Sequence, residues 1–132
     1  MKKIILFVLA SFFLLEAQAK ANFLCGYKDY FHLSDRIHPA VTIISANANQ
    51  DLYLQVISPR SFEIRDTPNC ETGYAHVTVG YDNFHWCVLD IKDGPYMNHP
   101  TITATCNGMQ YKNLSYDGFN SYSYTINLEL RS

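Results

Sequence analysis

The chain has 132 residues, of which 48% are hydrophobic, 17% charged and 14% aromatic, a balance that excludes an intrinsically disordered or collagen-like protein. The length fits a single domain of ordinary size. The formal net charge of −2 comes from scattered residues, which argues against nucleic acid as a partner, because nucleic-acid affinity depends on clustered cations.

The first 21 residues have the layout of a cleaved secretory signal peptide. A positively charged start precedes an apolar run over residues 4–15, and small-x-small cleavage sites end at Ala19 and Ala21. A helix of that run would extend about 18 Å, too short for a hydrocarbon core of about 30 Å, and no later segment could cross a bilayer. We therefore predict a secreted or periplasmic bacterial protein with one domain over residues 22–132.

Four cysteines lie within this domain, and we expect them to form two disulfides. An even number of cysteines in an exported chain of this size is typical of a disulfide-stabilised fold. A zinc site is disfavoured, because the gaps of 45, 17 and 19 residues contain no C-x-x-C pair. Spacing alone allows three pairings; the strand register described below favours Cys87–Cys106, which leaves Cys25–Cys70.

The first part of the domain carries the weaker patterns. Residues 23–38 fit a short helix about as well as a strand. Residues 41–45 and 52–57 are expected to pair as a hairpin, and Ser58-Pro59-Arg60 turns the chain into a strand over residues 62–65. The following residues, 66–73, form a loop that carries Cys70.

Residues 74–81 and 84–91 are expected to form the next hairpin, joined by a two-residue turn. In that register Val77 lies on the face opposite Leu89, so both strands are apolar on both sides. Either both are central in a sheet, or a bulge near Gly80 moves part of one strand to the other face.

The histidines do not predict a metal site. His76 and His85 share a face of this hairpin, but neither they nor the other histidines show a compact ligand spacing. We expect no metal and no cofactor.

Removal of residues 1–21 takes away three lysines and one glutamate, so the formal net charge changes from −2 to −4. A negatively charged domain is not expected to bind anionic membrane surfaces.

The C-terminal half has the strongest strand pattern. Polar and apolar residues alternate without a fault over residues 121–131. Asn107-Gly108 and Asp117-Gly118 are hairpin signals, and taking both as tight turns places Met109 opposite Ile126. With Cys87 opposite Cys106, four strands then share one apolar face, a sorting that a slip of one residue would reverse.

The fold class that follows is all-β. About eight short strands with frequent turns favour an antiparallel two-sheet sandwich or a partly open barrel, stabilised by two disulfides.

Little in the sequence indicates catalysis. There is no G-x-S-x-G motif, and paired cysteines leave no free thiolate. Three carboxylates, Asp82, Asp90 and Asp93, could be considered for glycoside hydrolysis, but they fall mostly at turns, where aspartate is common. The sequence therefore favours a non-catalytic protein.

Recognition of a protein or glycan partner fits better. The loop over residues 92–100 presents four candidate binding residues between two prolines: Tyr96, Met97, Asn98 and His99. The expected function is an exported binding module for a protein or host surface, such as an inhibitor or effector.

Three alternatives stay open. A carbohydrate-binding module would need an exposed aromatic platform, for which Trp86 is a candidate. A small secreted hydrolase would need a histidine and a carboxylate together in a cleft. A homodimer could form through an edge strand, and the C-terminal strand is a candidate for that edge.

Overall fold

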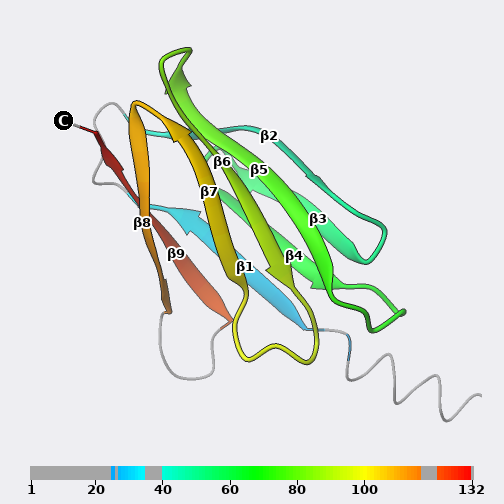
Figure 1. The fold of residues 1–132 in the computed structure, drawn as a ribbon. Coiled ribbons are helices and arrows are strands. Elements are labelled where there is room, and N and C mark those ends of the chain that lie inside the picture. Colours follow the sequence, from blue (N-terminus) through cyan, green and yellow to red (C-terminus); the bar gives the residue numbers. More distant parts are fainter. Residues whose placement is uncertain (1–24, 26, 35–39, 117–121, 132) are drawn as a thin grey trace, which may run out of the picture.

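A computed structural model describes residues 25, 27–34, 40–116 and 122–131, and these residues form nine strands and no helix. Two sheets lie face to face as a sandwich (Figure 1). The predicted two-sheet fold with two disulfides is confirmed, with nine strands in this part of the chain rather than about eight. The strands are β1 (Lys28–Leu33), β2 (Thr42–Ala48), β3 (Leu52–Ser58), β4 (Ser61–Asp66), β5 (Gly73–Asp82), β6 (His85–Asp93), β7 (Thr101–Asn107), β8 (Met109–Tyr116) and β9 (Ser123–Leu130).

The five-stranded sheet has the order β3-β4-β1-β9-β8, and the four-stranded sheet has the order β2-β5-β6-β7. Neighbouring strands are antiparallel except for β1 and β9, which run parallel and place Tyr30 beside Ser123. The ambiguous segment over residues 23–38 therefore contains a strand at the centre of a sheet; its remaining residues, other than 25, 27 and 34, lie outside the described part of the chain.

The core lies between the two sheets. Every second residue of most strands points inward, as the strand period of two requires. Phe31 stacks on Phe62 and on Tyr124, with ring centroids 4.8 and 5.4 Å apart. The other fully buried large side chains are Val41, Ile64, Val77, Val79, Leu89, Ile91, Met109, Ile126 and Leu128.

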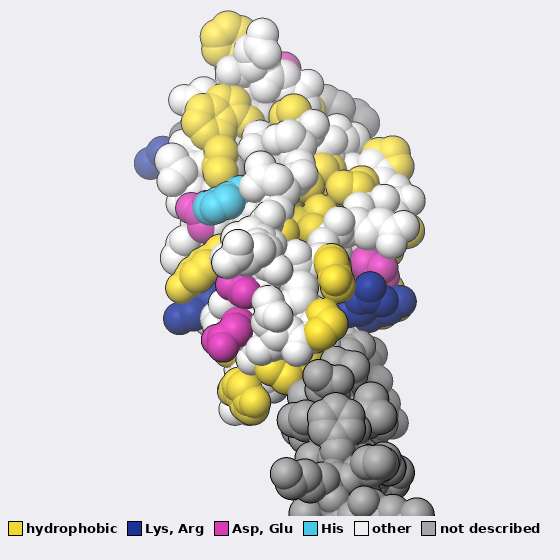
Figure 2. Space-filling model, turned by 90° about the vertical axis from the view of Figure 1, so that its right-hand side faces the viewer, with side chains coloured by type: hydrophobic (Ala, Val, Ile, Leu, Met, Phe, Trp, Pro, Cys, Tyr) yellow, Lys and Arg dark blue, Asp and Glu magenta, His cyan; other side chains and the backbone are white. Residues whose placement is uncertain are grey.

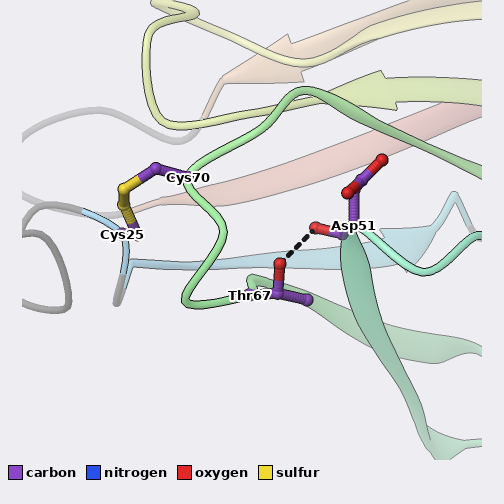
Figure 3. The surroundings of a disulfide bond; sticks show 4 residues. All are labelled: Cys25, Asp51, Thr67 and Cys70. Carbon is purple, nitrogen blue, oxygen red and sulfur yellow. Dashed lines mark hydrogen bonds between the residues drawn. A yellow bond between two sulfur atoms is a disulfide. The ribbon is translucent and has the colours of Figure 1, made fainter.

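The register predicted for β6 and β7 is confirmed. Cys87 pairs with Cys106 and forms a disulfide with it across the two strands. The second disulfide, Cys25–Cys70, ties the segment before β1 to the loop between β4 and β5 (Figure 3). The same loop is held by Thr67, whose hydroxyl donates a hydrogen bond to the backbone oxygen of Asp51 at 3.2 Å.

Two of the predicted hairpins are wrong, because the chain crosses between the sheets at those turns. β2 pairs with β5 in one sheet and β3 with β4 in the other, although they are consecutive. The Asn107-Gly108 turn likewise leads from β7 in the four-stranded sheet to β8 in the five-stranded sheet. The alternation of polar and apolar residues shows which side chains of a strand face the core. It does not show to which of the two sheets the strand belongs, because both sheets face the same core.

Two registers also differ from the prediction. A bulge between Gly80 and Asp82, one of the two alternatives considered, shifts the β5–β6 pairing by one residue. Val77 therefore pairs with Leu89 and is buried in the core instead of lying on the opposite face.

The register predicted for β8 and β9 is wrong: the observed pairing is shifted from it by four or more residues. Met109 pairs with Leu130, not with Ile126, and a further irregularity lies between Tyr111 and Asn113. The described pairs extend to Tyr116 with Tyr124, and the predicted Asp117-Gly118 turn lies outside the described residues.

The predicted C-terminal edge is not an edge, because β9 lies between β1 and β8. In the described ranges the edge strands are β2, β3, β7 and β8. Bulges at Ile44 and Ile57 interrupt β2 and β3, and such irregularities disfavour indiscriminate strand pairing.

On the side of the β2–β3 turn, hydrophobic side chains lie in separate groups among polar ones (Figure 2). The residues described contain no helix that could cross a membrane.

Gly108 makes the crossover from β7 to β8 possible. Its φ is +69°, and a Cβ atom there would collide with the backbone oxygen of Phe84. We expect Gly108→Ala to lower the free energy of unfolding by about 1–3 kcal/mol, measured by denaturant unfolding. The exposed control Thr105→Ala should change it by no more than about 0.5 kcal/mol. A Gly108→Ala variant as stable as the parent would contradict this role of the glycine.

Candidate functional site

The β6–β7 loop lies at one end of the sandwich, the lower end in Figure 1. Residues of this loop and of the neighbouring strands line a pocket of about 260 Å³. It forms where the β6–β7 loop (residues 94–100) meets the starts of β1 and β9 and the end of β4. We call it the acidic pocket. Its lining residues are Tyr27, Asp29, Asp66, Gly94, Pro95, Met97, Asn98, Pro100, Tyr122 and Tyr124.

Three carboxyl groups gather at this end because each continues an inward-facing row of its strand. Asp29 precedes Phe31 by two residues on β1, Asp66 follows Ile64 on β4, and Asp93 follows Ile91 on β6. Strand alternation therefore turns all three toward the interior, just where the apolar core ends. Asp66 and Asp93 are only 8% and 4% exposed.

Asp29 and Asp93 form a hydrogen-bonded carboxyl pair. Burial raises the pKa of Asp93 to about 9, and the hydrogen bond and charge of Asp29 act in the same direction. Burial also raises the pKa of Asp29, while its bond to Asp93 and the charge of His99 oppose that change. Near neutral pH, Asp93 therefore keeps its proton and donates it to the Asp29 carboxylate. The backbone N–H of Gly94 donates a further bond to Asp93 at 2.8 Å.

Asp66 is a different case, because its side chain lines the pocket and takes no part in this hydrogen-bonded pair. Burial raises its pKa to about 6, with a further contribution from the charge of Asp29, so the group is largely ionised at neutral pH. Among the described residues, no donor bonds to the Asp66 carboxylate, and no lysine or arginine lines the acidic pocket. A carboxyl group whose pKa is raised by burial and by a neighbouring negative charge is frequently part of a functional site.

Tyrosines surround these carboxyl groups. The rings of Tyr27 and Tyr122 lie 5.2 Å apart at the pocket, and both side chains are 46% exposed. Tyr27 is held in place because its backbone oxygen accepts a bond from the N–H of Asp66 and because Cys25, two residues earlier, is bound to Cys70 (Figure 3). Burial raises the pKa of Tyr124, so its hydroxyl stays protonated.

The four loop residues predicted from the sequence take different positions. Met97 and Asn98 line the acidic pocket. His99 packs against Tyr116 at 4.8 Å, and its Nδ1 is hydrogen-bonded to the hydroxyl of Tyr124 at 3.3 Å. Tyr96 does not line the pocket and is the most exposed large aromatic side chain described, at 77%.

Sequence reasoning missed most of the other lining residues. It considered Asp93 among three candidate carboxylates for glycoside hydrolysis and set them aside as turn residues, and it did not single out Asp29, Asp66, Tyr27 or Tyr122. The available signal was the spacing: each aspartate stands two positions from an inward-facing apolar residue. That signal identifies a site only once the three strands are known to end together.

The histidines near carboxylates lie elsewhere. His76 pairs with Asp90, and His85 pairs with Asp82 at 2.7 Å; all four side chains are substantially exposed. Each histidine has its own partner, so the two do not form a joint site. Within the described part of the chain, no group of three or more histidine, cysteine, aspartate or glutamate residues could hold a metal ion.

The buried carboxyl groups make stability depend on pH. Their folded-state pKa values lie above those of an unfolded chain, so the folded protein binds more protons, and stability falls as pH rises from about 4 to about 9. We expect Asp93→Asn to keep the bonds to Asp29 and Gly94 and to raise the free energy of unfolding by about 1–3 kcal/mol at about pH 8. Near pH 4 the gain should fall below about 1 kcal/mol.

Denaturant unfolding at both pH values measures this difference. The exposed variant Glu71→Gln is the control and should show no comparable gain. An Asp93→Asn variant with a lower free energy of unfolding than the parent at both pH values would contradict this prediction, because it would show that the carboxyl pair stabilises the folded protein.

Comparison with protein families, curated proteins and solved structures finds no match for this chain. The site is therefore defined by the geometry and chemistry of its own residues.

Proposed function

We propose that the chain is an exported, non-catalytic recognition module that binds a protein partner at the acidic-pocket end of the sandwich. The observation that carries this proposal is the group of exposed tyrosines at this end: Tyr27 and Tyr122 line the polar pocket and are each 46% exposed, and Tyr96, on the β6–β7 loop, is 77% exposed. Tyrosine offers a large, rigid contact area with a polar tip, which suits protein recognition.

The site is supported by a stiff scaffold. The β6–β7 loop is short, and the N–H of Met97 donates to the oxygen of Gly94 within it at 3.3 Å, while Pro100 is buried at its end. A loop that is already ordered lowers the entropic cost of binding. Two disulfides are consistent with an oxidising compartment, which supports secretion or periplasmic location as part of this proposal.

A second candidate function is peptide hydrolysis, favoured by one observation. Two aspartates that share a proton are the arrangement of aspartic proteases, and Asp29 and Asp93 form such a pair. Glycoside hydrolysis fits less well, because its carboxyl groups stand at least about 5 Å apart, whereas a hydrogen bond joins these two. Cleavage of a peptide library that Asp93→Asn abolishes would favour the hydrolase.

The carbohydrate-binding alternative depends on Trp86, which is half-buried on β6 opposite Gly80. This surface is distinct from the acidic pocket, so the two binding modes can be separated by substitution.

Affinity capture tests the recognition module. The protein, freed of residues 1–21, is presented to bacterial envelope extract, host-cell extract and a glycan panel. We expect a saturable protein partner whose affinity falls at least about tenfold in the double variant Tyr96→Ala with His99→Ala, because exposed aromatic contacts dominate such interfaces.

The matched control is Tyr53→Ala with Tyr74→Ala, which removes two tyrosines of 50% and 49% exposure that lie on β3 and β5, outside the β6–β7 loop and the acidic pocket. This variant should bind like the parent. Equal binding by the Tyr96/His99 double variant would reject the proposed surface, and capture by glycans alone would favour the carbohydrate-binding module.

A further inference from the structure

We propose that the acidic pocket receives a positively charged side chain, a lysine ammonium or an arginine guanidinium, from the protein partner. This inference rests on the proposed function and names the chemistry that the partner presents at that site.

The unpartnered Asp66 carboxylate is the main observation. The side chain is more than nine-tenths buried, lines the pocket and accepts no hydrogen bond from any described residue. A carboxylate normally accepts several hydrogen bonds, and no described residue supplies one to Asp66. A cationic group entering the pocket would provide both the missing hydrogen bonds and the missing charge.

No lysine or arginine in the pocket wall cancels the negative charge, and the positive charge that acts on Asp29 comes from His99, which does not line the pocket. The Asp29–Asp93 pair shares one proton and so adds a second negative charge beside Asp66. The basic residues next to the three aspartates along the chain are Lys28, Arg65 and Lys92, and strand alternation places them on the outer faces of the sheets. Arg65 lies there over the ring of Tyr53, at 5.0 Å from its centroid. The acidic pocket is therefore negatively charged inside a domain that is only mildly acidic.

Aromatic rings complete the site. Tyr27 and Tyr122 stand at the pocket beside the carboxyl groups, and the faces of such rings attract ammonium and guanidinium groups. The pocket volume of about 260 Å³ lies just below the range of about 300–1,000 Å³ typical of small-molecule sites, which suits one side chain better than a whole ligand. An organic cation also fits better than a metal ion, because the described residues offer no set of three metal ligands.

The test is an NMR titration of the chain without residues 1–21, using n-butylammonium and methylguanidinium as probes. We expect shifts confined to residues of the acidic pocket, with a Kd of about 1 mM, as befits a single charged group. The neutral analogues n-butanol and methylurea should cause no such shifts. Short peptides with blocked ends and a single lysine or arginine should bind at the same residues.

Asp66→Asn should weaken probe binding at least about tenfold. The substitution removes a buried charge and should not impair folding, which the dispersion of the amide spectrum verifies. The matched control is Asp82→Asn, at the β5–β6 turn at the opposite end of the sandwich (Figure 1), which should bind the probes like the parent.

Any of four results would overturn the inference. Neutral analogues could shift the same resonances equally, Asp66→Asn could bind as well as the parent, or free amines could bind while the lysine and arginine peptides do not. If the captured partner is lost in the Tyr96/His99 double variant but the probes do not bind, the proposed function stands and the cationic side chain is rejected.

Discussion

The packing of two sheets against each other requires every strand to present alternate side chains to a shared interior. The stacked rings of Phe31, Phe62 and Tyr124 fill the middle of that interior from three adjacent strands. The strands continue past the apolar core, so alternation still turns side chains inward where there is no more core to fill. Asp29, Asp66 and Asp93 occupy those places. The strand alternation that turns apolar side chains into the core therefore also turns these three carboxyl groups toward the acidic pocket. Their burial has a desolvation cost, which is why their pKa values are raised.

The two disulfides act on different parts of this arrangement. Cys87–Cys106 joins two neighbouring strands whose pairing the backbone already specifies. Cys25–Cys70 joins two segments outside the strands, and it holds the approach to β1 against the β4–β5 loop. The second bond thereby keeps Tyr27 beside the pocket. One disulfide supports the sheet, and the other supports the candidate binding surface.

The sequence allowed the β6–β7 register to be predicted, because a cysteine pair and the alternation of Leu89 and Ile91 agreed. It did not reveal the crossovers after β2 and β7, since an alternating strand fits either sheet. The binding loop could be proposed from Tyr96 to His99, but the carboxyl groups beside it could not. Asp29 and Asp93 are 64 residues apart in sequence, and only the three-dimensional pairing of distant strands shows that they meet.

The parallel pairing of β1 with β9 has a kinetic consequence. It joins residues as far apart as His32 and Thr125, whose side chains are hydrogen-bonded across a separation of 93 residues. Closing so long a loop costs entropy before any contact compensates for it, and a high contact order slows folding. The hairpins β3–β4 and β8–β9 can form locally, but β1 cannot complete the larger sheet until the last strand has been synthesised. Until then, the margin of β1 that later pairs with β9 stays unpaired and is open to aggregation.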